Sequence, residues 1–183
     1  CVLHWANEAH KVWPEAAFYC FDAMSEVRFL YDKPWIQEFY DVLLTKEDDH
    51  LVQFNMNVEH PGGNSYYDQN PAIVLDTHKY FNNTNKIPRF GRTLDKMVEL
   101  YDLPPPDLIK MDIQGAELDV LKGAENTLEQ TYHLILELQH TNYNLGAPQK
   151  EEVISWLDKK GFELVGDSFC KGEFDGDYHF RRK

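Results

Sequence analysis

Residues 104–124, PPPDLIKMDIQGAELDVLKGA, constrain the fold of this chain more than any other stretch. The three prolines mark a boundary, because proline does not fit inside a helix. A short apolar run over residues 108–113 follows and carries Asp112 near its end. Gly115 then leads into a segment whose leucines recur at helical spacing. The pattern predicts a buried strand, a tight turn and an amphipathic helix, with Asp112 at the carboxyl end of the strand.

The rest of the chain alternates strand-like and helix-like segments. Apolar runs of strand length occupy residues 16–21 and 133–138, and residues 151–160 have the period of an amphipathic helix. The C-terminal segments FELV and DYHFRRK alternate as two antiparallel strands do. Further helices are expected over residues 2–13 and 92–100, with Thr93 as N-cap of the second, and further strands over 39–44 and 53–58. An α/β fold with a mostly parallel sheet, helices on both faces and a C-terminal antiparallel hairpin is expected.

Length and composition narrow the class of protein. A chain of 183 residues favours one domain. The net charge of −13 argues against a nucleic-acid partner, whose affinity rests on basic residues that neutralise phosphates. Cys1, Cys20 and Cys170 are odd in number and show no CxxC spacing, which favours reduced thiols and a cytoplasmic setting. No apolar run approaches the roughly 20 residues of a membrane span.

Several blocks, in order, resemble those of the FkbM-type methyltransferases, a branch of the S-adenosylmethionine-dependent, Rossmann-like enzymes. They are PDLIKMDIQGAELDVLKGA, LILELQH (134–140), NYNLGAP (142–148), EEVISWLDKKGFELV, RTLDKMV (92–98) and GGNSYY (62–67). The likeness runs from residue 18 to the C-terminus. It implies a Rossmann-like methyltransferase fold with S-adenosylmethionine as cofactor. It also implies methyl transfer to a hydroxyl of a sugar, glycan or other natural product, with a small-molecule or glycan acceptor as the partner.

The resemblance implies a cofactor site as well. FYCFDAMSE is similar to the family's second strand, whose final acid accepts hydrogen bonds from the ribose hydroxyls, so Asp22 is the expected ribose ligand, with Ala23 beside it. Capping of the following helix is the alternative role for Asp22. Thr45 stands where family members carry Ser-Asp near the adenine. Lys46 occupies the place of the acid, for which Asp48 or Asp49 could substitute. Asp112 completes the expected cofactor-binding set.

The catalytic candidates are Asp112, Glu137 and His140, at the ends of two adjacent predicted strands. Methyl transfer from a sulfonium is an in-line displacement, and a hydroxyl acceptor must also lose a proton. His140 is the candidate whose ordinary pKa lies near neutrality. The same three residues could instead hold a divalent metal. Because the resemblance implies an enzyme that needs only the methyl donor, no metal site is expected. Glu117 has a structural explanation, since acids are favoured at helix N-termini.

One departure from the family pattern concerns the N-terminus. The family's first strand ends in a glycine-rich loop of the form DVGANxG, and this sequence contains none. A sheet without that central strand would expose an apolar edge on each neighbour. We therefore expect the chain to be incomplete at its N-terminus, and residues 1–183 to be a single methyltransferase domain that lacks the first strand and the glycine-rich loop. The alternative is a catalytically inactive, methyltransferase-like binding or scaffold module, which DVGANxG upstream of Cys1 would argue against.

Residues 59–89 are rich in Gly, Asn, Pro, Tyr and Asp. An irregular segment of this length inside a compact domain is usually a lid or a binding loop. Its aromatic residues, Tyr66, Tyr67, Tyr80 and Phe81, could stack on a sugar ring. They could equally anchor the loop to the core, and the sequence leaves both roles open.

Overall fold

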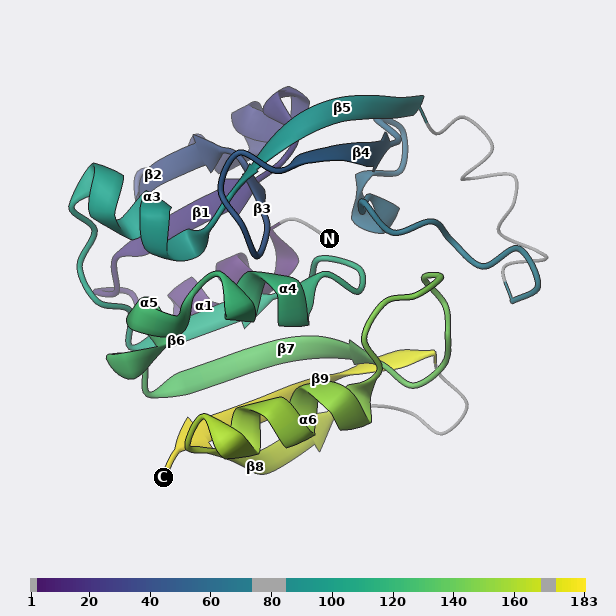
Figure 1. Ribbon diagram of the computed structural model, residues 1–183. Helices are drawn as coiled ribbons and strands as arrows, with labels where there is room; N and C mark the ends of the chain where they lie inside the picture. Colours follow the sequence, from purple (N-terminus) through teal and green to yellow (C-terminus); the bar gives the residue numbers. More distant parts are fainter. Residues whose placement is uncertain (1–2, 74–84, 169–173) are drawn as a thin grey trace.

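The computed structural model describes residues 3–73, 85–168 and 174–183 (Figure 1). The described strands form three sheets. The first sheet pairs β1 (Phe18–Asp22) with β2 (Ile36–Asp41). The second has the strand order β3 (Leu43–Leu44), β5 (Asn85–Arg92), β4 (Leu51–Met56). The third has the strand order β6 (Leu108–Met111), β7 (His133–Gln139), β9 (Asp175–Arg182), β8 (Phe162–Ser168). The helices are α1 (His4–Val12), α3 (Leu94–Tyr101), α4 (Glu117–Lys122), α5 (Glu125–Glu129) and α6 (Lys150–Lys159), with 3₁₀ turns η1 (Ser25–Tyr31) and η2 (Pro61–Gly63).

The expectation of a mostly parallel sheet is wrong. Among the described strands, β1–β2, β3–β5 and β6–β7 pair in parallel, whereas β4–β5, β7–β9 and β8–β9 are antiparallel. Alternation along one strand reveals its faces but not the direction of its neighbour, and β9 turns back to pair with both β7 and β8. The C-terminal antiparallel hairpin is confirmed as β8–β9. The molecule is therefore a mixed α/β fold.

The four-stranded sheet packs its apolar face against α4, α5 and α6, which lie in front of it in Figure 1. Leu134, Leu136 and Leu138 alternate along β7 and are completely or almost completely buried in this core. The intervening residues, which include Glu137, are only partly buried. On the two-stranded sheet, Phe39 stacks on Tyr31 of η1 while the neighbouring Tyr40 contacts Tyr101 of α3. Helical segments thus cover both faces of that sheet.

The predicted elements mostly form, but β5 was missed. The helices expected over residues 2–13, 92–100 and 151–160 are α1, α3 and α6, and Thr93 caps α3 by accepting a hydrogen bond from Lys96 N at 3.0 Å. The strand expected over 39–44 divides into β2 and β3, and that over 53–58 is β4. β5 contains Pro88 and Gly91, which lower its strand propensity. Pairing with β3 and β4 on its two sides nevertheless holds it extended.

Two of the three cysteines lie outside the described residues, and the third, Cys20, is a free thiol. Burial raises the pKa of Cys20 to about 11, so this thiol stays protonated at neutral pH. Within the described ranges, no helix combines the length and the apolar character that crossing a membrane demands.

Candidate active site

The turn between β6 and α4 has the geometry that its sequence predicts. Gln114 and Gly115 both have positive φ angles, of 55° and 92°. A Cβ at Gly115 would lie 2.7 Å from the Cβ of Ala147, so the chain comes too close there for any side chain. The strand, tight turn and helix expected from residues 104–124 are confirmed, and Asp112 follows directly after the end of β6.

Asp112 and Glu137 come together at the ends of the adjacent parallel strands β6 and β7. Nε2 of Gln114 donates to Oε2 of Glu137 at 2.9 Å and lies 3.4 Å from Oδ1 of Asp112. Burial, and then the neighbouring Asp112 carboxylate, raise the pKa of Glu137 to about 8. At neutral pH Glu137 therefore keeps its proton, and Asp112 carries the negative charge of the pair. The predicted convergence of these two acids is confirmed.

His140 is held by a different contact. Its Nε2 lies 2.7 Å from Oη of Tyr178 on β9, and the two rings meet edge to face. Tyr178 is buried in the core beneath α6 and pairs in register with Leu136, whereas Glu137 pairs with Asp177. The structure thus connects His140 to the helix-bearing face of the sheet. Among the described residues, no group of three or more His, Cys, Asp or Glu side chains could hold a metal ion.

Glu117 supports the turn. Its side chain is 3% exposed, and Oε1 accepts a hydrogen bond from the backbone N–H of Ile113 at 2.9 Å. Burial raises the pKa of this carboxyl to about 7. These contacts agree with the structural explanation for Glu117.

The GGNSYY block, residues 62–67, holds the same turn from the other side. Oγ of Ser65 donates to the backbone oxygen of Gln114 at 2.9 Å. The hydroxyls of Tyr66 and Tyr67 both donate to Oδ2 of Asp119 on α4, at 3.1 and 2.8 Å. These two tyrosines therefore anchor the loop, which is one of the two roles open from the sequence. Tyr80 and Phe81 lie outside the described residues.

A third block, NYNLGAP, completes this cluster of loops. Asn144 is fully buried, its Oδ1 accepts from Nε2 of Gln139 on β7, and its backbone N–H donates to Oε1 of the same glutamine at 3.2 Å. The backbone N–H of Leu145 donates to the oxygen of Asp68 at 2.7 Å, so residues 68–70 run alongside residues 142–145. Sequence reasoning identified the three blocks but missed the bridging roles of Gln114, Ser65 and Asn144, because their partners are distant in the chain.

The expected ribose ligand, Asp22, already has internal partners. Oδ1 accepts from the backbone N–H of Met24 at 2.9 Å, and Oδ2 accepts from the Tyr31 hydroxyl at 3.1 Å. Burial raises the pKa of Asp22. The capping role is not observed, because Met24 is the N-cap of η1 and no side-chain hydrogen bond caps this turn. A carboxylate has about four acceptor positions, so these contacts leave capacity that could accept a hydroxyl of a ribose. Ala23, next to it, is buried.

Thr45 lies in a packed position. Its side chain is 3% exposed, and Oγ1 donates to the backbone oxygen of Glu47 at 2.8 Å. A Cβ at Gly91 would lie 2.1 Å from Oγ1 of Thr45, and a Cβ at Gly123 would lie 2.4 Å from its backbone oxygen. Thr45 is thus enclosed between the backbone at Gly91 and the backbone at Gly123. Its role beside an adenine stays a prediction.

These residues fit S-adenosylmethionine in part. Asp22 is the last residue of β1, and Asp112 follows the end of β6, so both stand at carboxyl ends of strands, where ligands of α/β sheets bind. The two strands run in the same direction in Figure 1. The spare acceptor positions of Asp22 suit a ribose. The Thr45 hydroxyl already donates its proton to Glu47, and residues 1–183 hold no DVGANxG loop to contact the methionine end.

Comparison with known proteins identifies the family of this chain. The family model of the methyltransferase FkbM domain matches residues 5–164. The chain belongs to the FkbM methyltransferase family. One curated relative, the hexuronic acid methyltransferase AglP of Haloferax volcanii, is 27% identical over 90 residues, which is 48% of this chain. The matched part covers only 36% of the length of that relative. No solved structure gives a significant match.

Proposed function

We propose that this FkbM-family protein is an S-adenosylmethionine-dependent O-methyltransferase that acts on a hydroxyl of a sugar, glycan or related natural product. The observation that supports this most is that three family blocks meet at one point. They are GGNSYY, PDLIKMDIQGAELDVLKGA and LILELQH. Ser65 contacts the turn at Gln114, and Gln114 in turn bridges the two acids at the ends of β6 and β7. The relative AglP is a hexuronic acid methyltransferase, which supports a sugar acceptor.

In this proposal each acid has its own task. The bound cofactor would supply an electrophilic methyl group on its sulfonium. Asp22 would accept hydrogen bonds from the ribose with the acceptor positions that Met24 and Tyr31 leave free. Asp112 would contact the cofactor and, as the ionised member of its pair, take the proton from the acceptor hydroxyl. Glu137 would keep its proton and orient Asp112. His140, in contact with Tyr178, is the alternative base.

Binding of S-adenosylhomocysteine, measured by calorimetry on the full-length protein, tests the cofactor site. Asp22→Asn should weaken binding by about 10- to 150-fold, because charged acceptors of hydrogen bonds contribute roughly 1.5–3 kcal/mol. Tyr31→Phe removes an internal partner of the same carboxylate and should leave the affinity within about threefold, which corresponds to well under 1 kcal/mol. Unchanged binding in Asp22→Asn would remove Asp22 from the site.

Transfer of an isotopically labelled methyl group to hexuronic acid and hexose glycosides tests the activity. Asp112→Asn should lower kcat by about 10²–10⁴-fold, the usual contribution of general base catalysis. An His140→Asn enzyme with normal turnover would dismiss the histidine, and activity abolished by EDTA and restored by Mg²⁺ would contradict the metal-free scheme. If the full-length protein binds no cofactor and transfers no methyl group, the inactive binding module is the better description.

A further inference from the structure

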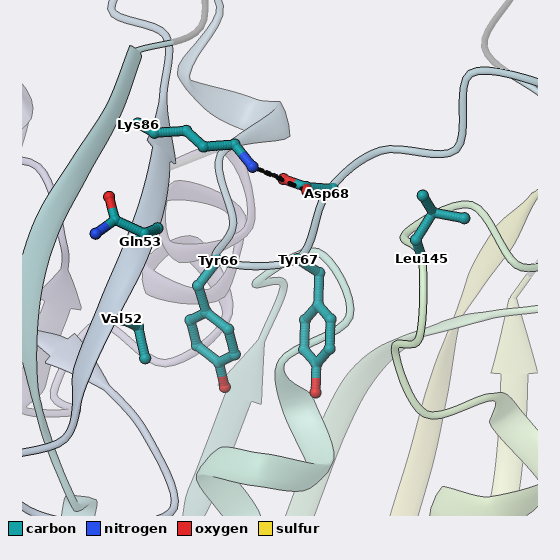
Figure 2. A pocket seen from close by; sticks show the side chains of 7 residues that line it. All are labelled: Val52, Gln53, Tyr66, Tyr67, Asp68, Lys86 and Leu145. Carbon is teal, nitrogen blue, oxygen red and sulfur yellow. Dashed lines mark hydrogen bonds and ion pairs between the residues drawn. The ribbon is translucent and has the colours of Figure 1, made fainter.

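A surface pocket of about 430 Å³ lies between β4, β5 and the loops that contact the turn between β6 and α4 (Figure 2). This volume falls within the range of roughly 300–1,000 Å³ that is usual for small-molecule sites. The pocket is lined by Val52, Gln53, Tyr66, Tyr67, Asp68, Lys86 and Leu145. None of these residues belongs to the cofactor-binding or catalytic set proposed above.

The two tyrosines present their rings to this pocket and keep their polar ends elsewhere. Their hydroxyls point away from Lys86 and Asp68 in Figure 2 and donate to Asp119. Burial, chiefly, raises the pKa of both phenols, so they stay protonated hydrogen-bond donors. The ring centroids of Tyr66 and Tyr67 lie 5.1 Å apart. Together the rings form an aromatic surface that suits the apolar C–H face of a sugar ring.

Polar groups stand on the opposite side of the pocket. Nζ of Lys86 lies 2.7 Å from Oδ1 and 2.9 Å from Oδ2 of Asp68, and both side chains are 54% exposed. An exposed ion pair contributes only about 0–1 kcal/mol, so a ligand can share its partners at little cost. Gln53 also lines the pocket, is exposed, and offers both a donor and an acceptor. Closely spaced donors and acceptors of this kind match the adjacent hydroxyls of a sugar.

The adjoining loops contain polar atoms whose hydrogen-bonding capacity is not used. Four buried side-chain polar atoms of the described residues have no hydrogen-bond partner, and three of them belong to Gln69, Thr141 and Asn144. Gln69 follows Asp68 and Asn144 precedes Leu145, so these atoms lie in the two loops that form one wall of the pocket. Buried polar groups are normally paired, and a concentration of unpaired ones favours a region that receives a polar ligand or its water.

We propose that this pocket is the acceptor subsite and that it takes a pyranose sugar ring, with the ring face against Tyr66 and Tyr67. Gln53, Asp68 and Lys86 then hydrogen-bond the hydroxyls, and Lys86 also faces the carboxylate when the sugar is a hexuronate. The assignment of an acceptor rests on the proposed function. The contact between Ser65 and Gln114 supports it, because it couples the pocket loop directly to the turn beside Asp112.

Titration of the full-length protein with methyl α-glucoside, and separately with methyl α-glucuronide, tests the subsite. NMR of ring-labelled tyrosines should show the Tyr66 and Tyr67 signals shifting with at least one sugar. Gln53→Ala and Lys86→Gln change exposed side chains and should each raise the Kd about 2- to 13-fold, as the loss of one hydrogen bond predicts. Lys96→Gln, an exposed lysine on α3, is the matched control and should leave the Kd unchanged.

Failure of this inference differs from failure of the proposed function. If neither sugar shifts the tyrosine signals, or if Gln53→Ala and Lys86→Gln bind as tightly as the unaltered protein, the pocket is not a sugar subsite. If methyl transfer proceeds and both variants keep the KM of the acceptor, the acceptor lies elsewhere while the methyltransferase assignment stands. Sugar binding that depends on Gln53 and Lys86 in a protein without methyl transfer would keep the pocket and overturn the enzyme.

Discussion

Gly115 is the position in the candidate site where a single atom matters most, because its φ is 92° and Ala147 packs against it. Gly115→Ala should lower the free energy of unfolding by about 1–2 kcal/mol through the left-handed backbone. The overlap of the new Cβ with Ala147, 2.7 Å away, should cost a further 1–3 kcal/mol or so. Urea unfolding at equilibrium measures the sum.

Gly146 provides a matched control for that variant. Its φ is 78°, but a Cβ there would meet nothing within 4 Å. Gly146→Ala should therefore lower the free energy of unfolding only by the cost of the left-handed backbone, about 1–2 kcal/mol. Equal unfolding midpoints for the two variants would show that the approach of Ala147 does not constrain the turn.

Glu117 should make stability depend on pH. Its pKa is raised from 4.5 to about 7 by burial, so the folded protein binds the proton more tightly than the unfolded chain does. The resulting stability is fully present below pH 4.5 and is lost as the pH rises through about 7, a change of roughly 3 kcal/mol. Glu117→Gln cannot ionise and should lack this loss. The difference in unfolding free energy between the two proteins should grow across that window.

At the scale of elements, the hydrogen bonds from the GGNSYY loop to Asp119 of α4 decide whether the loop is a lid or part of the scaffold. The structure predicts that residues 65–70 are protected from amide hydrogen exchange without any ligand. The reason is that the side chains of Ser65, Tyr66 and Tyr67 all donate hydrogen bonds to residues 114–119. Tyr67→Phe removes one hydrogen bond to the Asp119 carboxyl, which is worth about 1–2 kcal/mol at a half-buried site. Protection of the loop should then fall about 5- to 30-fold.

Tyr132→Phe is the control for this experiment, since Tyr132 is 60% exposed. Its removal of a hydroxyl should leave exchange in residues 65–70 unchanged. Fast exchange of these residues in the unaltered protein would instead support a mobile lid that closes on ligands.

At the scale of the whole molecule, the described strands leave β1 and β6 with one partner each. β7, in contrast, is paired on both edges, with β6 and β9. Amides of β7 should therefore exchange more slowly than those of β1, whose two-stranded sheet is marginal by itself. We propose that residues 1–183 form one domain and that the family's first strand, where present, pairs with these edges. A chain carrying that strand should protect β1 and β6, and no change in their exchange would contradict the proposal.

The sequence by itself determined the features that depend on neighbouring residues. Apolar periodicity placed α1, α3 and α6, and the glycine at position 115 predicted the tight turn, because period and backbone angle are local properties. The ends of β6 and β7 also followed from local pattern. Since these strands were expected to be adjacent and parallel, the meeting of Asp112 and Glu137 could be predicted as well.

Only the tertiary structure decided the contacts between distant residues. It paired β9 with β7 and so placed Tyr178 against His140, and it enclosed Thr45 between Gly91 and Gly123. It also brought Tyr66 and Tyr67 to Asp119, more than 50 positions along the chain. Local pattern leaves such contacts undetermined, because the free energy of a pairing depends on the partner surface that folding brings opposite each residue.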